Sequence, residues 1–306
     1  MRISELLSHA SRVLAQSGIQ DPAFEAGLLL SWLLKVSSGY LYAHGDASVS
    51  AEKEEGFKSL VDRRSRGEPM AYITGECEFM SLNFLVNPHV LIPRADTELL
   101  AEAALYALGH KIPLFNQKMI RLNAVPNRVL DIGTGSGCLA VTLAKLVPGL
   151  LVDALDISRD ALKTAEENAR RHGVSQSIRF IEADYLKSQD FTQEVYQIII
   201  SNPPYIAYSE KEGLMPSVRD YEPHLALFAH DNGLAFYRRI AFDARHLLDK
   251  GGIVLVECGY QQAEAVEAIF WEIGMETLVL RDLSGIKRVV VGHFPDYANR
   301  HDVQAS

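Results

Sequence analysis

The sequence predicts an α/β protein with a doubly wound, mostly parallel sheet that has one antiparallel edge strand, plus a small N-terminal helical domain joined to it by a β-hairpin. From residue 129 onward, short apolar strands alternate with helices of about 10–15 residues, which is the pattern of a parallel sheet covered on both faces. The last two strands follow each other too closely for a crossover connection. They must form a hairpin, so one edge strand is antiparallel.

The helical domain is expected over residues 1–75, because apolar residues recur at helical spacing there. The first helix covers residues 3–14, where apolar positions lie three and four residues apart. Asp21-Pro22 then provides a helix start, with proline at the first helical position, for an apolar helix to about Lys35. A third, highly charged helix is expected from about Ala51 to Arg66.

The β-hairpin linker is expected over residues 76–95. The stretch CEFMSLNFLVNPHVLIP is aromatic and β-branched, contains Asn-Pro and lacks a helical period. The sheet domain then covers residues 96–306. It opens with a helix from Asp96 to about Leu108, followed by an irregular surface segment over 109–127.

The remaining elements alternate regularly. The expected strands are Val129–Ile132, Leu151–Asp156, Ile178–Ile181, Val195–Ser201, Ile253–Glu257, Thr277–Arg281 and Arg288–Gly292. The expected helices run from the glycine-rich turn to Val147, over Ala161–His172, from about Leu234 to Leu248 and from about Gln262 to Ile273.

Composition and charge narrow the class of protein. The formal net charge is -9, whereas proteins that grip nucleic acid usually carry an excess of basic residues, so no nucleic-acid partner is expected. No segment reaches the ~20 apolar residues of a membrane-spanning helix, and the N-terminus lacks a signal-peptide core. Cys77, Cys138 and Cys258 are scattered, which indicates a reducing compartment with neither a disulfide framework nor a zinc site. We therefore expect a cytoplasmic protein with no metal and no membrane partner.

A glycine-rich motif, VLDIGTGSG, follows the first strand of the sheet. A turn of this kind lets the backbone approach a ligand beside a helix N-terminus, which makes Gly133, Thr134, Gly135, Ser136 and Gly137 candidate cofactor-binding residues. Asp156 ends the second strand, where a carboxylate can accept both hydroxyls of a ribose. Three interpretations compete. A dinucleotide fingerprint would need its third glycine at Cys138; the G-x-G-x-G spacing resembles the S-adenosylmethionine motif of class I methyltransferases; and a turn without a ligand is the structural alternative.

A second motif, Asn202-Pro203-Pro204-Tyr205, follows the fourth strand, at the sheet edge where ligands bind. The carbonyls of Asn202 and Pro203 can accept hydrogen bonds from a planar NH2 group and stabilise the positive charge that develops on it during methylation. Tyr205 offers a flat face for the same group. Asn202, Pro203 and Tyr205 are therefore the catalytic candidates, and these three together with Pro204 are the substrate-binding candidates. The alternative is a strand terminator with a packing tyrosine.

Two further positions follow the third strand. Asp184 can accept a hydrogen bond from an adenine amino group, and Tyr185 can pack beside the ring; a polar strand end is an equal alternative. His224 and His230 show no metal-ligand spacing and are interpreted as loop residues.

These motifs together resemble amino-group methyltransferases, and the upstream residues narrow the resemblance. They are Arg66-Gly67-Glu68-Pro69, Tyr72-Ile73, Gly75, Glu78-Phe79, VLIPRADTE at Val90–Glu98 and the late stretch RDLSGIKRVVVG. The whole chain is similar to the HemK/PrmC family, which methylates the glutamine of the Gly-Gly-Gln motif in class I peptide chain release factors.

The resemblance implies a class I S-adenosylmethionine-dependent protein-(glutamine-N5) methyltransferase. Gly133–Gly137, Asp156, Tyr185 and Asn202 would contact S-adenosylmethionine, and Asn202–Tyr205 would hold the glutamine. The N-terminal helices and the hairpin would recognise the release factor. Two residues depart from the family pattern: Ala95 stands where proline is usual, and Tyr185 where tryptophan is common.

Three rival functions stay open at this point. A sister family methylates glutamine in a large-subunit ribosomal protein, although the LIPRADTE segment favours the release-factor branch. A DNA adenine methyltransferase is disfavoured by the acidic balance and by the absence of an obvious target-recognition domain. A non-catalytic binding module is disfavoured by the intact glycine, acid and Asn-Pro-Pro-Tyr motifs.

Overall fold

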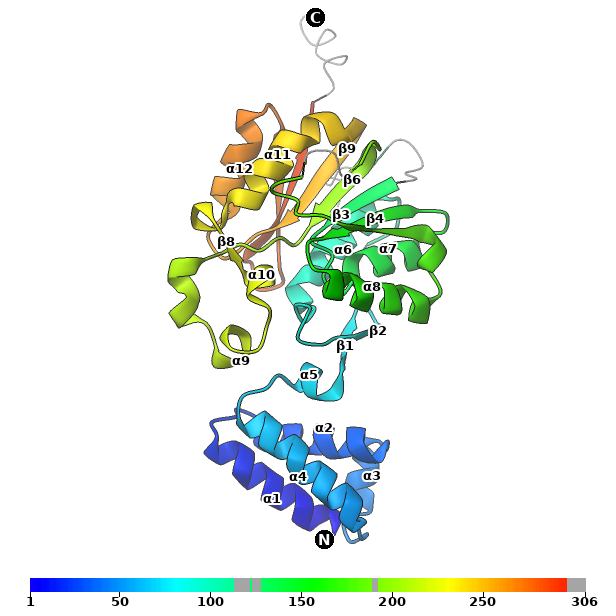
Figure 1. The fold of residues 1–306 in the computed structure, drawn as a ribbon, viewed down its shortest axis with the longest axis vertical. Coiled ribbons are helices and arrows are strands. Elements are labelled where there is room, and N and C mark those ends of the chain that lie inside the picture. Colours follow the sequence, from blue (N-terminus) through cyan, green and yellow to red (C-terminus); the bar gives the residue numbers. More distant parts are fainter. Residues whose placement is uncertain (113–121, 123–127, 189–191, 296–306) are drawn as a thin grey trace, which may run out of the picture. The chain divides into compact units, whose positions relative to one another are not determined.

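The computed structural model describes residues 1–112, 122, 128–188 and 192–295. The chain divides into two units, and Figure 1 shows the elements of both, coloured along the sequence. The first unit comprises Met1–Glu76 and Leu214–Tyr221, and the second comprises Cys77–Gly213 and Glu222–Ser306. Segment 214–221, far along the sequence, belongs to the first unit; the Tyr221 hydroxyl donates to the backbone oxygen of Arg66 at 2.9 Å.

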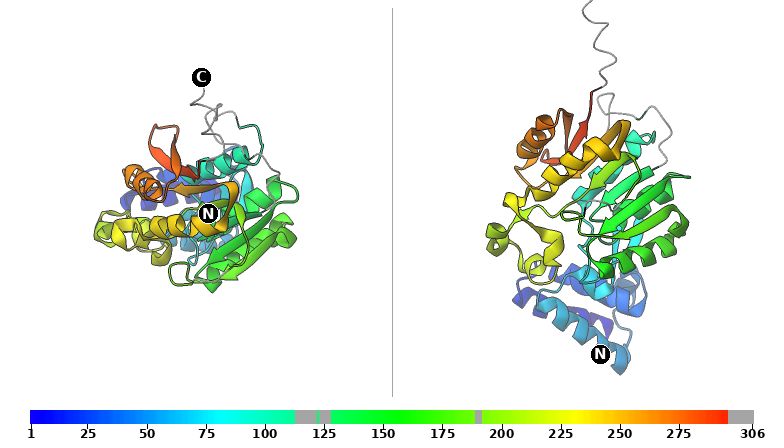
Figure 2. Two further views of the ribbon diagram at one scale, coloured as in Figure 1. Left: turned by 90° about the horizontal axis from the view of Figure 1, so that it is seen from above. Right: turned by 45° about the horizontal axis from the view of Figure 1, so that its top comes forward.

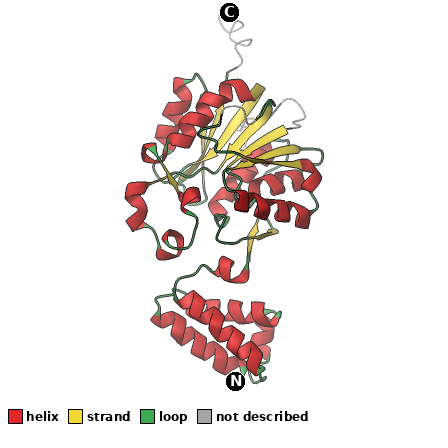
Figure 3. Ribbon diagram, viewed as in Figure 1, coloured by secondary structure: helices red, strands yellow, loops and turns green. Residues whose placement is uncertain are grey.

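The first unit consists mainly of helices (Figure 3). They are α1 (Ile3–Gln16), α2 (Pro22–Leu34), α3 (Ser38–Ala43), α4 (Ala51–Ser65), α5 (Met70–Thr74) and α9 (Pro216–Arg219). Apolar residues of α1, α2 and α4 form its core, which confirms the three predicted helices. The helices α3, α5 and α9 are too short to show a periodic pattern. Ser37 and Ser50 cap α3 and α4 by accepting backbone N–H bonds.

A two-stranded hairpin of β1 (Glu76–Phe79) and β2 (Leu82–Leu85) confirms the first half of the predicted linker. Met80 and Ser81 both have positive φ, at 50° and 59°, the backbone geometry of a tight two-residue turn. The predicted hairpin linker over residues 76–95 is too long, because residues 86–94 are turn and irregular backbone. Asn-Pro and Ile-Pro within that stretch cannot continue a paired strand.

The second unit is organised around a seven-stranded sheet in the order β10-β11-β9-β6-β3-β4-β5. Its strands are β3 (Arg128–Ile132), β4 (Leu151–Asp156), β5 (Ile178–Glu182), β6 (Tyr196–Ser201), β9 (Leu248–Glu257), β10 (Glu276–Arg281) and β11 (Lys287–His293). Pairing is parallel from β9 to β5, which confirms the predicted fold class. The single antiparallel strand is β11, which pairs with both β9 and β10, so β10 forms the outermost strand on that side.

Helices cover both faces of this sheet (Figure 2). One face packs against α6 (Ala95–Ala107), α7 (Cys138–Leu146) and α8 (Arg159–His172), and the other against α11 (Ala235–Leu247) and α12 (Ala263–Glu272). Strand residues alternate between the two cores; Ile198 and Ile200 face the first, and Ile199 faces the second. Because both faces of the sheet are buried, the sequences of its central strands are continuous apolar runs.

Several short elements connect β6 to α11 and were not predicted. They are β7 (Ile206–Ala207), the 3-10 helices η2 (Tyr208–Gly213) and η3 (Asp231–Gly233), α10 (His224–Leu227) and β8 (Phe228–Ala229); η1 (Ser175–Ser177) precedes β5. The strand β9 also starts earlier than the predicted residue 253. Most of the predicted irregular segment 109–127 lies outside the described residues. Among the helices that the structure describes, none is long and apolar enough to cross a membrane.

Candidate active site

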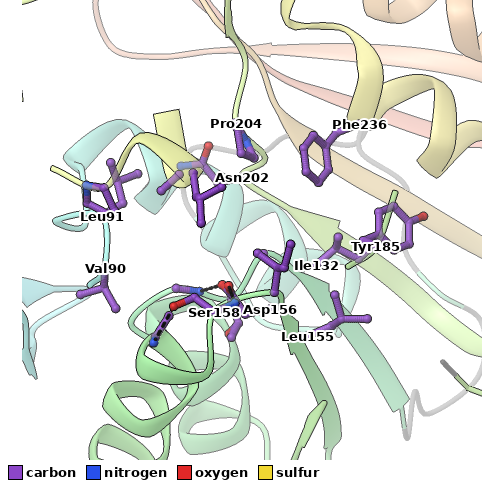
Figure 4. Close-up of a pocket in the computed structure, with 18 of the residues that line it drawn as sticks. Val90, Leu91, Ile132, Leu155, Asp156, Ser158, Tyr185, Asn202, Pro204 and Phe236 are labelled. Atoms are coloured by element: carbon purple, nitrogen blue, oxygen red, sulfur yellow. Dashed lines mark hydrogen bonds between the residues drawn. The ribbon is translucent and has the colours of Figure 1, made fainter. Parts of the chain in front are cut away.

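A cavity of about 340 Å³ lies in the second unit, where β3, β4, β5 and β6 end (Figure 4). Nine of the residues predicted from the sequence line it: Gly133, Thr134, Gly135, Ser136, Asp156, Asp184, Tyr185, Asn202 and Pro204. Gly137, Pro203 and Tyr205 lie next to these residues in the chain but are not among the described residues that line the cavity. The two motifs, about 65 residues apart in the sequence, therefore meet at one site because their strands are neighbours in the sheet.

The glycine-rich turn has a conformation that its glycines make possible. Gly133, Gly135 and Gly137 have φ values of 74°, 55° and 78°, a region that other residues rarely adopt. A Cβ on Gly133 would meet nothing within 4 Å, so this backbone borders open space. A Cβ on Gly137 would lie 2.9 Å from the Cβ of Ala165, so Gly137 lets α7 start close against α8.

Asp156 connects the end of β4 to the glycine-rich turn. Its Oδ2 accepts the N–H of Gly135 and its Oδ1 accepts the N–H of Ser158, both at 2.9 Å (Figure 4). Burial raises the pKa of the Asp156 carboxyl, and the backbone N–H donors oppose that rise. Each carboxylate oxygen has two lone pairs, so both keep capacity for one further donor from the cavity.

Tyr185 forms an aromatic wall of the cavity with Phe236, which the sequence analysis did not single out. Their ring centroids are 6.4 Å apart with planes inclined by 16°, and the Arg239 guanidinium lies 5.3 Å from the Tyr185 centroid. Arg239 also donates to the backbone oxygens of Leu186 and Ser188, which anchors the loop after β5. The side chain of Asp184 accepts the Leu186 N–H and pairs with Lys187 within the same loop.

Asn202 is held by a threonine from a distant part of the chain. Its Nδ2 donates to the Oγ1 of Thr97 at 3.0 Å, and Thr97 is 2% exposed in the first turn of α6. With the amide nitrogen engaged in this way, the Oδ1 of Asn202 is the group left to accept a hydrogen bond in the cavity.

The rest of the Asn-Pro-Pro-Tyr segment is fixed by its surroundings. Gln262 donates to the backbone oxygen of Tyr205 at 2.8 Å and accepts the N–H of Gly259. A Cβ on Gly233 would lie 2.0 Å from that Tyr205 oxygen, so only glycine fits there. Burial raises the pKa of the Tyr205 hydroxyl. Pro203 is buried and Tyr205 is half-buried, and their predicted contacts with the substrate remain predictions.

Two buried carboxyl groups, neither of which lines the cavity, were not predicted as functional. Asp131 of β3 is fully buried and accepts the Thr134 hydroxyl at 2.7 Å; burial raises its pKa to about 7. Glu257, at the end of β9, is 2% exposed, and burial raises its pKa to about 7 as well. Asp131 was visible inside the glycine motif and Glu257 at a strand end, but burial of an acidic residue cannot be read from its position in a sequence.

Several side chains of the VLIPRADTE segment make polar contacts within the second unit. Four of its side chains have partners: Arg94 pairs with the buried Glu222, Asp96 with Arg288, Thr97 with Asn202, and Glu98 with the N–H of Met80. Ala95 is the first residue of α6, the position where proline is common in helices and alanine is equally free of strain. The departure at Ala95 therefore leaves these contacts in place.

Of the two histidines that were interpreted as loop residues, His230 lies in a turn between β8 and η3, whereas His224 belongs to a short helix. His224 begins α10, and His230 lines the cavity and packs its ring near Tyr208. Within the described ranges, no group of three or more His, Cys, Asp or Glu side chains is arranged to hold a metal ion.

Two family models match the chain. The PrmC N-terminal domain matches residues 5–75, and the methyltransferase small domain matches residues 116–215. Curated relatives match it over nearly its whole length. The release factor glutamine methyltransferase of Koribacter versatilis is 36% identical over 295 residues, which are 96% of this chain and 99% of that protein. The chain belongs to the release factor glutamine methyltransferase family. The family's protein from Geobacter sulfurreducens is 38% identical over 291 residues, covering 95% of this chain and 96% of that one.

Longer relatives also contain this family's sequence. The bifunctional methyltransferase of Rickettsia felis is 36% identical over 304 residues, and the chain spans 57% of its length; the other bifunctional relatives are covered over 54–57%. Among solved structures, the hMettl16 catalytic domain in complex with MAT2A 3′UTR hairpin 1 has a TM-score of 0.55 and 16% identity, covering 81% of this chain and 82% of that one. That likeness extends to the fold alone. The resemblance to the HemK/PrmC family is confirmed.

Proposed function

We propose that this chain transfers a methyl group from S-adenosylmethionine to the side-chain amide nitrogen of the glutamine in the Gly-Gly-Gln motif of class I peptide chain release factors. The observation that carries the proposal is the orientation of Asn202, whose amide nitrogen is bound to Thr97 and whose carbonyl is left to face an NH2 group. The names of the full-length relatives support the release factor as substrate. The cytoplasmic location and the lack of a nucleic-acid partner remain predictions from the sequence.

The cavity fits S-adenosylmethionine in size and in the chemistry of its lining. Its volume of about 340 Å³ is within the usual range of small-molecule pockets. Asp156 keeps one lone pair on each oxygen for the two ribose hydroxyls, and the open backbone at Gly133 can approach the amino-acid portion. The Tyr185 and Phe236 rings provide an apolar wall for a planar base.

The residues of the Asn-Pro-Pro-Tyr segment would hold the glutamine amide for reaction. When bound, S-adenosylmethionine supplies a methyl group activated by a positively charged sulfur. The amide nitrogen is a weak nucleophile, since its lone pair is delocalised into the adjacent carbonyl. Acceptors at Asn202 Oδ1 and the Pro203 carbonyl would each take one N–H, orient the nitrogen and stabilise the positive charge that grows on it. Proline contributes no N–H that would compete for these acceptors.

The first unit is proposed to recognise the release factor. Phe24 of α2 and Tyr42 of α3 are 67% and 88% exposed, an apolar surface that a protein partner could bury. In the full chain, Phe24→Ser combined with Tyr42→Ser should raise the KM for release factor several-fold and leave cofactor affinity unchanged. Glu55→Gln, an exposed change on α4, is the matched control.

A transfer assay with a radiolabelled methyl donor tests the substrate class directly. Purified class I release factor, large-subunit ribosomal proteins and double-stranded DNA are offered separately to the full chain. Label in the release factor supports the proposal. Label in a ribosomal protein or in DNA, with none in the release factor, would contradict it.

A further inference from the structure

A buried acidic side chain stands at the end of the strand next to the one that leads into Asn202. Glu257 ends β9, next to β6, the strand that leads into Asn202. It is 2% exposed, and within the described part of the chain its Oε2 has no hydrogen-bond partner. Leaving a carboxylate buried in this way costs stability, so a compensating role is expected.

Thr97 connects this carboxyl group to Asn202. The Thr97 hydroxyl accepts the Asn202 Nδ2–H at 3.0 Å, and the same hydroxyl lies beside the Glu257 carboxyl group, whose pKa it lowers. A hydroxyl has one hydrogen to donate. Because its oxygen already accepts from Asn202, its hydrogen is free to point to the carboxylate of Glu257.

We propose that Glu257 and Thr97 are positioning residues that fix the side-chain amide of Asn202 with its carbonyl toward the cavity. The inference rests on the proposed function, in which that carbonyl accepts an N–H from the substrate amide. An ionised carboxylate can only accept, so it dictates which way the Thr97 hydroxyl points, and the hydroxyl in turn dictates which end of the Asn202 amide it binds.

Protonation of Glu257 would reverse the orientation of the Asn202 amide. A protonated Glu257 can donate to Thr97, which frees the Thr97 hydrogen to bind the Oδ1 of Asn202. The Asn202 amide would then turn its NH2 group into the cavity, where it would face the NH2 group of the substrate. Two donors cannot hydrogen-bond to each other, so the substrate nitrogen would lose an acceptor.

The groups around Glu257 hold its pKa near neutral pH, where its ionised and protonated forms interconvert. Burial raises its pKa to about 7, Asp96 acts in the same direction, and the hydrogen bonds from Thr97 and Tyr205 and the charge of Arg288 lower it. The remaining titratable groups that interact with it are Tyr237 of α11, Cys258, which directly follows β9, and Cys138 of α7. The pKa of each of these three is itself raised by burial, which keeps them neutral near pH 7, so among these side chains Glu257 is the one expected to change charge there. Asp131 is another buried acid whose pKa is raised to about 7.

Substitutions at Thr97 separate positioning from packing. Thr97→Val keeps the shape and removes the hydroxyl, whereas Thr97→Ser keeps the hydroxyl. We expect Thr97→Val to lower kcat about tenfold or more with a much smaller change in KM for release factor, and Thr97→Ser to stay within about threefold of the unmodified enzyme. Equal activity of Thr97→Val and the unmodified enzyme would overturn the inference.

The pH profile tests Glu257. Transfer by the unmodified enzyme should fall as the pH decreases through about 7, because protonated Glu257 releases the Asn202 amide. Glu257→Gln has no charge to lose at this position, so the fall in rate near pH 7 should be clearly smaller than in the unmodified enzyme, whatever the absolute rate; any slope that remains belongs to other groups such as Asp131. An unchanged profile in Glu257→Gln would overturn the inference, and this comparison decides the matter if Thr97→Val does not fold.

A spectroscopic measurement is independent of methyl transfer. In 15N-labelled full chain, the side-chain NH2 signals of Asn202 are identified by their loss in Asn202→Ala. They should shift between pH 6 and 8 and should exchange faster with water in Thr97→Val. Asn202 signals that change neither with pH nor in Thr97→Val would contradict the inference. A chain that shows these changes but methylates no release factor would instead contradict the proposed function, so the two failures are distinguishable.

Discussion

The two halves of the candidate active site are held in different ways. The cofactor half, Gly133–Gly137 with Asp156, is fixed by backbone N–H groups that come from within two residues of the carboxylate or from the adjacent strand's turn. The acceptor half, Asn202–Tyr205, is fixed by side chains from distant parts of the chain: Thr97 lies 105 residues from Asn202, and Gln262 lies 57 from Tyr205. The first half is therefore robust to changes in neighbouring side chains, and the second depends on them.

Asn202→Ala should produce the largest effect and should affect the acceptor half alone. It removes the acceptor that stabilises the charge on the substrate nitrogen, so transfer should slow by ~10²-fold or more while cofactor affinity changes little. Single-turnover transfer and calorimetry with the cofactor give the two numbers. If cofactor affinity falls by the same factor as the rate of methyl transfer, the cofactor half and the acceptor half do not act separately.

Asp156→Ala should affect the cofactor half. It removes a charge-assisted acceptor and also the group that holds the Gly135 N–H, so cofactor binding should weaken by ~1–3 kcal/mol. Glu182→Gln is the control, since Glu182 is an exposed acid at the end of the neighbouring strand β5. Calorimetry should find Glu182→Gln unchanged; equal losses in both variants would mean that Asp156 has no specific role.

Gly233→Ala tests whether the acceptor half depends on its distant supports. The added Cβ would lie 2.0 Å from the Tyr205 oxygen, so the Asn-Pro-Pro-Tyr segment must shift, and transfer should fall about tenfold with cofactor affinity retained. Gly285→Ala has a similar φ of 81° but meets nothing within 4 Å, so it shows the cost of backbone strain alone. Thermal unfolding of both variants separates strain, about 1–2 kcal/mol, from displacement.

The buried carboxyl groups should give the smallest effect, a pH dependence of stability. The pKa of Glu257 is raised from 4.5 to about 7, so the folded chain binds a proton that the unfolded chain releases between these values. Its contribution to the free energy of unfolding should therefore decrease as the pH rises from about 4.5 to 7. Denaturant unfolding should find the curve of Glu257→Gln flatter than that of the unmodified chain over this range. Parallel curves would mean that Glu257 does not titrate there.

The same contrast explains which features could be predicted from the sequence. The glycine spacing and Asp156 act through local backbone geometry, and strand order brings Asn202 to the same edge; the structure places these residues, Gly137 excepted, around one cavity, and their contacts with a cofactor remain predictions. Thr97 and Glu257 were not identified, because Thr97 of α6, Asn202 after β6 and Glu257 at the end of β9 come together only in the folded chain, which no local pattern records. Short elements such as β7 and α10 escaped prediction for a related reason: a few residues show no period, and tertiary contacts decide their shape.

Locating the methyl group on the product tests the central claim most directly. Class I release factor is incubated with the full chain and S-adenosylmethionine, digested and analysed by fragment mass spectrometry. The account predicts a gain of roughly 14 Da on the glutamine of the Gly-Gly-Gln peptide, lost when that glutamine is replaced and strongly reduced with Asn202→Ala. A methyl group on any other residue, or full methylation by Asn202→Ala, would contradict it.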